Sequence, residues 1–351
     1  MITLFFSLIL GLFTFMFFIF IWNKFEFLKK KHNSLIGDQQ IHIKYTPRIG
    51  GLVIFTLLII FYFMKGAFDF SSIFTKVFLV SLIPLAIISM KEDIFLNTKP
   101  MHRLVGIFIT SALIIFFSIP DLPTIDLPLL STLMNIQLVN YTFFILALTL
   151  LANGMNLIDG SNGLSGFTSM ASIIALGIIA FLSNDIDTMY SCLIFSMILL
   201  SFLFLNYPLA RVFLGDTGAY LNGIIIGFLI INFYGKHPEL PAWSAVLLIF
   251  YPIVEVIFSF FRKLYLGKSP FFPDSKHLHI KLYGILNKGI NDKSQKSNYL
   301  ITPFLTVLWL GPPSAATIFF TNSLMCIFVI IIFLFLYGFI YISLPENKNV
   351  K

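Results

Sequence analysis

Residues 206–223 read NYPLARVFLGDTGAYLNG and lead into an apolar run at 219–233. Within a few residues the chain changes from a polar segment with Arg211 and Asp216 to a stretch without a charged side chain. This alternation recurs along the chain, in which 58% of the 351 residues are hydrophobic and 11% are charged. Because soluble domains carry roughly 25% charged residues, the apolar runs indicate helices that cross a lipid bilayer.

Eleven apolar runs are predicted spans. A membrane helix needs roughly 20 apolar residues, and a tilted or buried helix can be shorter, at ~17. The predicted spans are 2–22, 49–64, 73–90, 104–119, 138–152, 164–182, 189–205, 219–233, 242–261, 299–319 and 324–343. We therefore expect an all-α, polytopic membrane helix bundle that forms one integral membrane domain over residues 1–351. No small-residue cleavage site follows the first run, so we expect a retained helix rather than a removed signal peptide.

Lys and Arg side chains are concentrated in alternate connections, which together hold 20 of the 23. These connections are 23–48, 91–103, 153–163, 206–218 and 262–298, with the tail 344–351. The positive-inside rule then predicts a cytoplasmic position for these loops and the C-terminus, and a periplasmic N-terminus. The net charge of +7 is therefore interpreted as topology, and no nucleic-acid partner is expected.

The same loops and the adjoining helix ends carry many carboxylates. Six of the 16 acidic residues lie there: Glu92, Asp93, Asp159, Asp216, Glu255 and Asp274. Neighbouring carboxylates repel each other, so at a membrane interface they usually need a cation, a proton or a function. Hard oxygen ligands of this kind suit Mg²⁺, which often binds one or two carboxylates together with substrate phosphates.

Glycine-rich turns and basic side chains accompany the carboxylates. Turns at 50–51, 160–163 and 215–218 would let backbone N–H groups approach a bound anion closely. Further phosphate contacts are offered by Arg48, Arg103, Lys276, His277 and His279. The combination predicts a Mg²⁺-dependent site for a phosphorylated substrate.

Taken singly, these signals also have simpler interpretations. Glu92 and Asp93 could be a solvated pair, the His-x-His motif could face water, and Asp159–Gly160 is a common turn. Arg48 and Arg103 could serve only as topology determinants. Their joint placement on one face of the bundle favours a shared site.

With TPRIGG at 46–51, Glu92–Asp93, NGMNLIDGSNGL at 153–164, GDTGAY at 215–220 and HLH at 277–279, the chain resembles a known family. These are the polyprenyl-phosphate N-acetylhexosamine-1-phosphate transferases of glycosyltransferase family 4. The resemblance implies that undecaprenyl phosphate attacks the β-phosphorus of a UDP-N-acetylhexosamine and releases UMP, which initiates a lipid-linked cell-surface glycan such as O-antigen. It also implies a bacterial inner-membrane location, contact with membrane lipid, Mg²⁺ with Mn²⁺ as a substitute, and formation of a homodimer.

The resemblance implies roles for individual residues. The implied catalytic residues are Glu92, Asp93, Asp159 and Asp216. Among them, Glu92 and Asp93 match an acidic pair that deprotonates or orients the lipid phosphate, while Asp216 and Asn156 match metal ligands. The implied substrate contacts come from Arg48, Arg103, Asn156, Gly160, Asn162, Asn206, Phe213, His277 and His279, with uracil stacked on Phe213.

Three positions depart from the family pattern, in which Asp is usual. Glu92 and Glu255 retain the charge with one more methylene, whereas Asn162 cannot carry charge and is therefore not expected to act as a base or anionic ligand. The short HLH motif favours a simple N-acetylhexosamine donor over UDP-MurNAc-pentapeptide. Alternatives are a transporter, although no repeat is visible, a CDP-alcohol phosphotransferase, although its DGxxAR signature is absent, and an inactive scaffold.

Overall fold

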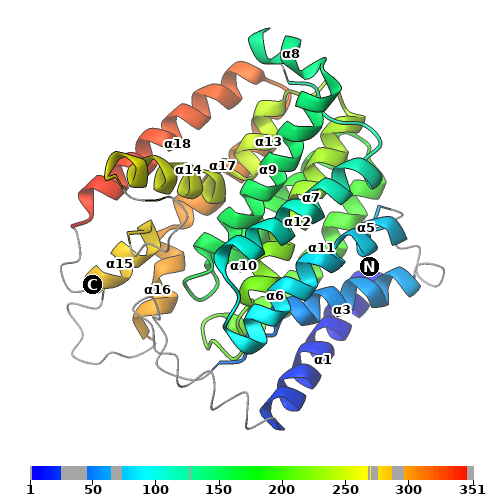
Figure 1. Ribbon diagram of the computed structural model, residues 1–351, viewed down its shortest axis with the longest axis vertical. Helices are drawn as coiled ribbons and strands as arrows, with labels where there is room; N and C mark the ends of the chain where they lie inside the picture. The colour runs from blue at the N-terminus through cyan, green and yellow to red at the C-terminus, as the bar shows by residue number, and fades with distance from the viewer. Residues whose placement is uncertain are drawn as a thin grey trace.

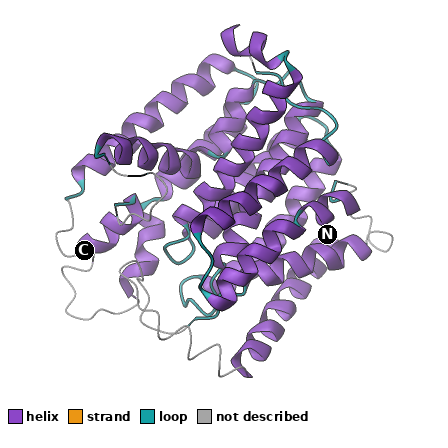
Figure 2. Ribbon diagram, viewed as in Figure 1, coloured by secondary structure: helices purple, strands orange, loops and turns teal. Residues whose placement is uncertain are grey.

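The computed structural model describes residues 2–24, 46–64, 73–125, 128–267, 269, 276–286 and 296–345. Within these ranges the regular elements are all helices, which confirms the predicted all-α class (Figure 2). Most of the predicted loop 23–48, and residues 270–275 of the fifth loop with Asp274, lie outside the described residues. The helices are α1 (Ile2–Lys24), α3 (Gly50–Phe63), α5 (Lys76–Ser81), α6 (Ile83–Phe95), α7 (Pro100–Phe117), α8 (Pro128–Met134), α9 (Gln137–Ile158), α10 (Leu164–Leu182), α11 (Ile186–Asn206), α12 (Gly215–Lys236), α13 (Ala242–Leu248), α14 (Phe250–Tyr265), α15 (Leu278–Leu286), α16 (Lys296–Phe304), α17 (Thr306–Phe319) and α18 (Ser323–Ser343).

The helices form a polytopic membrane bundle. In the described part of the chain, 8 helices are long and apolar enough to cross a membrane, or 9 if the bent pair α13 and α14 counts as one span. Each predicted apolar run is helical, although α3 is shorter than a full span and the run at 73–90 is divided between α5 and α6. Outward-facing side chains on the terminal helices are large and apolar, with Phe13 67%, Phe335 77% and Ile342 82% exposed. Lipid is the solvent that suits such a surface.

Helix α12 lies at the centre of the bundle (Figure 1), and every residue from Gly215 to Tyr234 is buried. It packs against α9, α3 and α6. The backbones of α12 and α9 approach closely at a pair of small residues. A Cβ at Gly223 would lie only 2.5 Å from the Cα of Ala152 on α9. Membrane helices commonly associate through such small residues, since their backbones can then approach.

Prolines divide three of the predicted runs. Pro252 has no N–H to donate to the carbonyl of Leu248, and the hydroxyl of Ser172 donates to that carbonyl instead at 2.7 Å. The axes of α13 and α14 meet at 83°, so the span predicted at 242–261 is a pair of helices with a sharp bend between them, and α14 lies across the bundle (Figure 1). Pro84 near the start of α6 and Pro303 in α16 accompany the other two breaks.

Several predicted loop boundaries are wrong because helices continue into polar sequence. Asn156 lies in the last turn of α9, which ends at Ile158 rather than at 152. Asn206 is the last residue of α11, and Asp216 lies in the first turn of α12. A hydropathy criterion stops at the first polar side chains, whereas the backbone hydrogen bonds of a helix continue through them.

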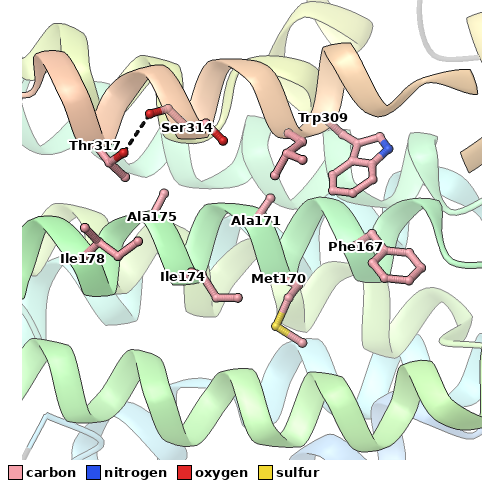
Figure 3. A pocket seen from close by; sticks show the side chains of 10 residues that line it. Phe167, Met170, Ala171, Ile174, Ala175, Ile178, Trp309, Ser314 and Thr317 are labelled. Carbon is pink, nitrogen blue, oxygen red and sulfur yellow. Dashed lines mark hydrogen bonds between the residues drawn. The ribbon is translucent and has the colours of Figure 1, made fainter. Parts of the chain in front are cut away.

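A shallow apolar groove of about 180 Å³ runs between α10 and α17 (Figure 3). Its lining includes Phe167, Met170, Ile174 and Trp309, and the hydroxyl of Thr317 is satisfied by the carbonyl of Ser314 at 2.7 Å. None of the predicted site residues lines this groove. The charged residues predicted for the site instead lie around the first turn of α12.

The crossing of α3 over α12 provides a stability test. A Cβ at Gly51 would lie 2.2 Å from the nitrogen of Gly218 and 2.5 Å from the carbonyl carbon of Thr217, both backbone atoms that side-chain rotation cannot move away. We expect Gly51→Ala to lower the free energy of unfolding by about 1–3 kcal/mol, measured as a lower Tm in detergent. Gly338→Ala on α18 meets nothing within 4 Å and is the matched control. It should leave the Tm unchanged or raise it, because alanine favours helix; equal losses in the two variants would contradict the close crossing.

Candidate active site

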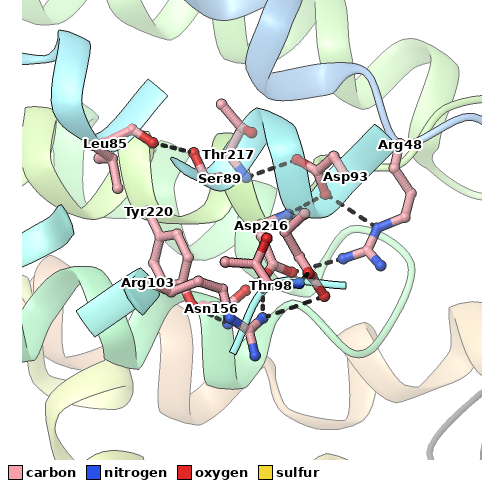
Figure 4. A network of polar contacts seen from close by, with 11 residues as sticks. Arg48, Leu85, Ser89, Asp93, Thr98, Arg103, Asn156, Asp216, Thr217 and Tyr220 are labelled. Atoms are coloured by element: carbon pink, nitrogen blue, oxygen red, sulfur yellow. Dashed lines mark hydrogen bonds and ion pairs between the residues drawn. The ribbon is translucent and has the colours of Figure 1, made fainter. Parts of the chain in front are cut away.

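The carboxylate of Asp93 caps the N-terminus of α12. Asp93 Oδ1 accepts a hydrogen bond from the backbone N–H of Asp216 at 2.8 Å, and Oδ2 accepts one from the N–H of Thr217 at 2.9 Å (Figure 4). The first N–H groups of a helix have no partner within the helix, and its N-terminus favours negative charge. Gly215 has a φ of +73°, and a Cβ there would lie 2.6 Å from Asp93 Oδ1, which explains the glycine at this turn.

Two arginines bind the carboxylate of Asp216 from opposite sides (Figure 4). Arg48 Nη2 donates to Asp216 Oδ1 at 2.7 Å, and Arg103 Nη1 donates to Asp216 Oδ2. Arg48 Nε also lies 3.3 Å from Asp93 Oδ1. Burial disfavours the charged form of Arg48, but the carboxylates of Asp93 and Asp216 outweigh it and raise the pKa of this guanidinium. The site is therefore a buried network of charges in which each ion has an opposite neighbour.

The two carboxylates of the acidic pair Glu92–Asp93 bind different parts of the backbone. Glu92 Oε2 accepts from the backbone N–H of Thr98 at 2.7 Å and so fixes the turn between α6 and α7, where Leu96 has a φ of +51°. Glu92 Oε1 lies 3.9 Å from Arg103 Nη1. Both carboxylates thus support neighbouring backbone, and their implied action on a lipid phosphate stays a prediction.

The segment before α3 is joined to the segment before α12 by backbone hydrogen bonds. The N–H of Phe213 donates to the carbonyl of Pro47 at 2.9 Å, and the N–H of Gly50 donates to the carbonyl of Phe213 at 2.9 Å. The N–H of Gly51 likewise donates to the carbonyl of Leu214 at 2.9 Å. These bonds place Arg48 beside Asp216. They also mean that the predicted anion contact of the 50–51 turn is wrong, because both N–H groups are already donated to protein carbonyls.

The third loop approaches this charge cluster through Asn156 and Asp159. Asn156 Nδ2 donates to the hydroxyl of Tyr220 at 3.0 Å, which lies one turn after Asp216 on α12 (Figure 4). Burial raises the pKa of Asp159 well above its usual value; the charge of Arg48 opposes this, and those of Asp216 and Asp93 add to it. Asp159 therefore lies within electrostatic reach of the cluster. Tyr220 was not predicted from the sequence, although its place one turn after Asp216 is a signal that could have identified it.

Asn206 and Asn162 connect loops in this structure. Asn206 Oδ1 accepts from the N–H of Gly163 at 2.7 Å, and its Nδ2 donates to the carbonyl of Val212 at 2.8 Å. Asn162 Nδ2 donates to the carbonyl of Pro208 at 3.2 Å. Both amides thus hold the third loop against the fourth, and their predicted substrate contacts stay predictions. A carboxylate at 162 could not donate to Pro208, which gives a physical reason for Asn at this position.

The histidines of the HLH motif lie next to the third loop. A Cβ at Gly160 would lie 2.2 Å from Nε2 of His279, so any larger residue would displace this ring. The rings of His277 and His279 are 6.0 Å apart and nearly parallel, and His277 Nδ1 lies 3.1 Å from Glu255 Oε1. Burial, followed by the effect of His277, lowers the pKa of His279 to about 4. His279 is therefore a neutral hydrogen-bonding group near pH 7 rather than a cation.

Apart from Asn162, Asn206 and Phe213, which bind backbone groups of the loops, the predicted residues fall into two groups that meet at the third loop. The first is the charge cluster of Arg48, Glu92, Asp93, Arg103 and Asp216, approached by Asn156 and Asp159. The second is the histidine pair, in which His279 packs on Gly160 and His277 is held by Glu255. Among the described residues, no group of three or more His, Cys, Asp or Glu side chains already has the arrangement of a metal site.

Comparison with known proteins gives a consistent result. Residues 75–234 match the family described as glycosyl transferase family 4. The chain is 28% identical over 257 residues to an undecaprenyl-phosphate alpha-N-acetylglucosaminyl 1-phosphate transferase of Thermotoga maritima, which covers 73% of each chain. It is 27% identical over 308 residues to a probable undecaprenyl-phosphate N-acetylglucosaminyl 1-phosphate transferase of Bacillus subtilis, covering 85% of this chain and 81% of that one. An Escherichia coli K12 protein with the same name as the Thermotoga enzyme is 30% identical over 194 residues, or 53% of this chain and 51% of that one.

The helix cap at Asp93 can be tested by Asp93→Asn. An amide retains one acceptor but places an N–H₂ group against a helix N–H, so we expect a loss of about 1–3 kcal/mol in the free energy of unfolding. Asp185→Asn is the matched control, because Asp185 caps α11 through the N–H of Thr188 at 3.0 Å and lies outside the charge cluster. Asn caps a helix about as well as Asp, so thermal unfolding in detergent should show a lower Tm for Asp93→Asn and little change for Asp185→Asn. An unchanged Tm for Asp93→Asn would argue against its role as a cap.

Proposed function

Because the chain belongs to glycosyl transferase family 4, we propose that it transfers an N-acetylhexosamine 1-phosphate from a UDP-sugar to undecaprenyl phosphate. The products are undecaprenyl-diphosphate-sugar and UMP. The relatives named above carry N-acetylglucosaminyl in their names, so UDP-N-acetylglucosamine is the first donor to consider.

The convergence of charged side chains around Asp216 carries this proposal. Arg48 precedes α3, Asp93 ends α6, Arg103 begins α7 and Asp216 begins α12, so four separate segments contribute to one cluster. The cluster lies at an end of the bundle, among loops rather than in its apolar centre. A lipid phosphate anchored in a membrane and a water-soluble nucleotide-sugar can meet only at the membrane surface, where the ends of the helices lie.

The reaction is a phosphoryl transfer. An oxygen of the acceptor phosphate forms a bond to the β-phosphorus of the donor, the bond from that phosphorus to the bridging oxygen breaks, and UMP leaves with the bridging oxygen. Such reactions depend mainly on positioning and on charge neutralisation. Arg48 and Arg103 are the two guanidiniums of the charge cluster and would bind phosphate oxygens in exchange for Asp216.

A base is not essential for this chemistry. The second pKa of a phosphate monoester is about 6, so the acceptor is already largely a dianion at neutral pH. The observed role of Asp93 as a helix cap is compatible with this, since its carboxylate orients the turn that carries Asp216. We therefore assign Asp93 to positioning and Asp216 to the substrate or metal contact.

The residues fit a magnesium ion. Asp216 and Asn156 would hold Mg²⁺, with Mn²⁺ as a substitute, and both offer the hard oxygen ligands that these ions prefer. Glu92, Asp93, Asp159 and Asp216 place four carboxyl groups near the two arginines, and a bound divalent cation would favour the ionised form of Asp159, whose pKa burial raises. When bound, the ion would neutralise the diphosphate of the donor.

The proposed setting is the bacterial cytoplasmic membrane with the site facing the cytoplasm. The bias of 20 of 23 Lys and Arg residues toward the loops of this side supports that orientation. In that setting the enzyme would initiate a lipid-linked cell-surface glycan, and a homodimer is the proposed assembly.

A donor screen tests the proposed reaction. Purified protein in detergent with undecaprenyl phosphate and Mg²⁺ should release UMP from UDP-N-acetylglucosamine or a related UDP-N-acetylhexosamine, and UDP-glucose is the control donor. Chelation by EDTA should stop the release, and added Mg²⁺ should restore it. The proposal would be contradicted if well-folded protein released no UMP from any UDP-N-acetylhexosamine.

Asp216→Ala tests the assignment of the central carboxylate. Loss of a preorganised charged group at a phosphoryl-transfer site costs about a hundred- to a thousandfold in kcat, and we expect at least that loss together with weaker Mg²⁺-dependent binding of the UDP-sugar by calorimetry. Asp187→Ala removes an exposed carboxylate near the start of α11 and is the matched control. Activity that is unchanged in Asp216→Ala would remove this residue from the metal and substrate site.

A further inference from the structure

We propose that Tyr337 on α18 is a positioning residue for His277, acting through the carboxylate of Glu255. This inference rests on the proposed function, because it assigns His277 a place in that site. Helix α18 lies outside residues 75–234, which match the family, and it contributes no side chain to the charge cluster. Its role would be to hold the histidine pair in place from the side of the pair that faces away from the charge cluster.

Three donors converge on Glu255, which is 1% exposed. Tyr337 donates its hydroxyl to Glu255 Oε2 at 2.7 Å, and the backbone N–H of Leu278 donates to Oε1 at 3.0 Å. His277 Nδ1 is the third partner, 3.1 Å from Oε1. A buried carboxylate is costly unless its lone pairs are satisfied, so this arrangement holds the carboxylate in one orientation.

The arrangement defines which nitrogen of His277 carries a proton. An ionised carboxylate can only accept hydrogen bonds, so Nδ1 of His277 must be the donor. In the neutral ring Nε2 is then the acceptor, and in the charged ring Nε2 is a second donor. A carboxylate that fixes the ring and its proton in this way determines what Nε2 offers to a ligand.

Tyr337 is unusual on its helix. Among the residues of α18 only Cys326, Val329 and Tyr337 are buried, and Tyr337 is 1% exposed. Phenylalanines 335 and 339, on either side of it, are 77% and 71% exposed. Within the described part of the chain, the hydrogen bond of this buried hydroxyl is the one to Glu255, so the polar end of Tyr337 serves that carboxylate.

The next turn of α18 holds the segment just before His277. Tyr341 donates its hydroxyl to the carbonyl of Lys276 at 3.1 Å, and Arg262 Nη1 donates to the same carbonyl at 2.7 Å. Lys281 Nζ donates to the carbonyl of Tyr341 at 2.8 Å. Helix α18 therefore binds the 276–281 segment before and after the two histidines, of which His279 packs against Gly160 of the third loop.

A double-mutant cycle tests the proposal. Tyr337→Phe should lower kcat/KM for UMP release about tenfold, the usual effect of losing a hydrogen bond to a charged group. If Tyr337 acts through His277, the same substitution should cost nothing further in a His277→Ala background. Tyr234→Phe is the matched control, because the hydroxyl of Tyr234 is also buried and lies 2.6 Å from Ser244 Oγ outside the site. It should leave kcat/KM unchanged in both backgrounds.

Two results would overturn the proposal. One is an equal loss from Tyr337→Phe with and without His277, which would mean a merely structural role, and the other is no loss in the wild-type background. Tm and gel filtration report the folding of each variant. If Tyr337→Phe does not give a monodisperse protein, Glu255→Gln takes its place and should show the same dependence on His277.

A measurement without turnover separates this inference from the proposed function. In protein labelled with ¹⁵N-histidine, the resonances lost in His277→Ala identify the ring, and a protonated Nδ1 is expected in the wild type. A bare Nδ1 would overturn the inference even if UMP release is observed. If the wild type releases no UMP while Nδ1 is protonated, the proposed reaction fails and the Tyr337–Glu255–His277 connection stands.

Discussion

The capping of α12 by Asp93 is the interaction on which the rest of the site depends. The two carboxylate oxygens of Asp93 accept hydrogen bonds from the N–H groups of Asp216 and Thr217. These bonds orient the first turn of α12, in which every residue from Gly215 to Tyr234 is buried. Arg48 and Arg103 then reach Asp216 from two other helix ends. Without the cap, a buried helix terminus would lose its partners, and the carboxylate at the centre of the cluster would lose its fixed position.

Several polar side chains of the described loops and helix ends contact other parts of the protein. Glu92, Asn162 and Asn206 all bind backbone groups, and glycines at 50, 51, 160 and 215 allow other parts of the chain to approach closely. The family motifs therefore combine two functions, since some residues present charge and others hold the loops together. A motif residue is thus not by itself a residue that touches substrate.

Sequence reasoning was most successful where the signal is repeated over many residues. Hydropathy predicted helices at all eleven apolar runs, and the motif order predicted the family. It was least successful at individual points, namely the 83° bend before α14, the helical positions of Asn156 and Asn206, and the contact partners of Gly50 and Gly51. Tyr220 was missed although it ends the GDTGAY motif, one turn after Asp216. Tyr337 was missed because a single tyrosine inside an apolar run has no distinctive pattern.

The sequence by itself determined the membrane class, the helical fold and the set of charged residues gathered on one side. These properties follow from the transfer of each side chain between water and lipid, which is local and additive along the chain. Only the tertiary structure decided which polar groups pair, because partners such as Asp93 and Asp216 are 123 residues apart. Such pairing depends on distances of a few ångströms and on exclusion of water, and both exist only once the helices have packed.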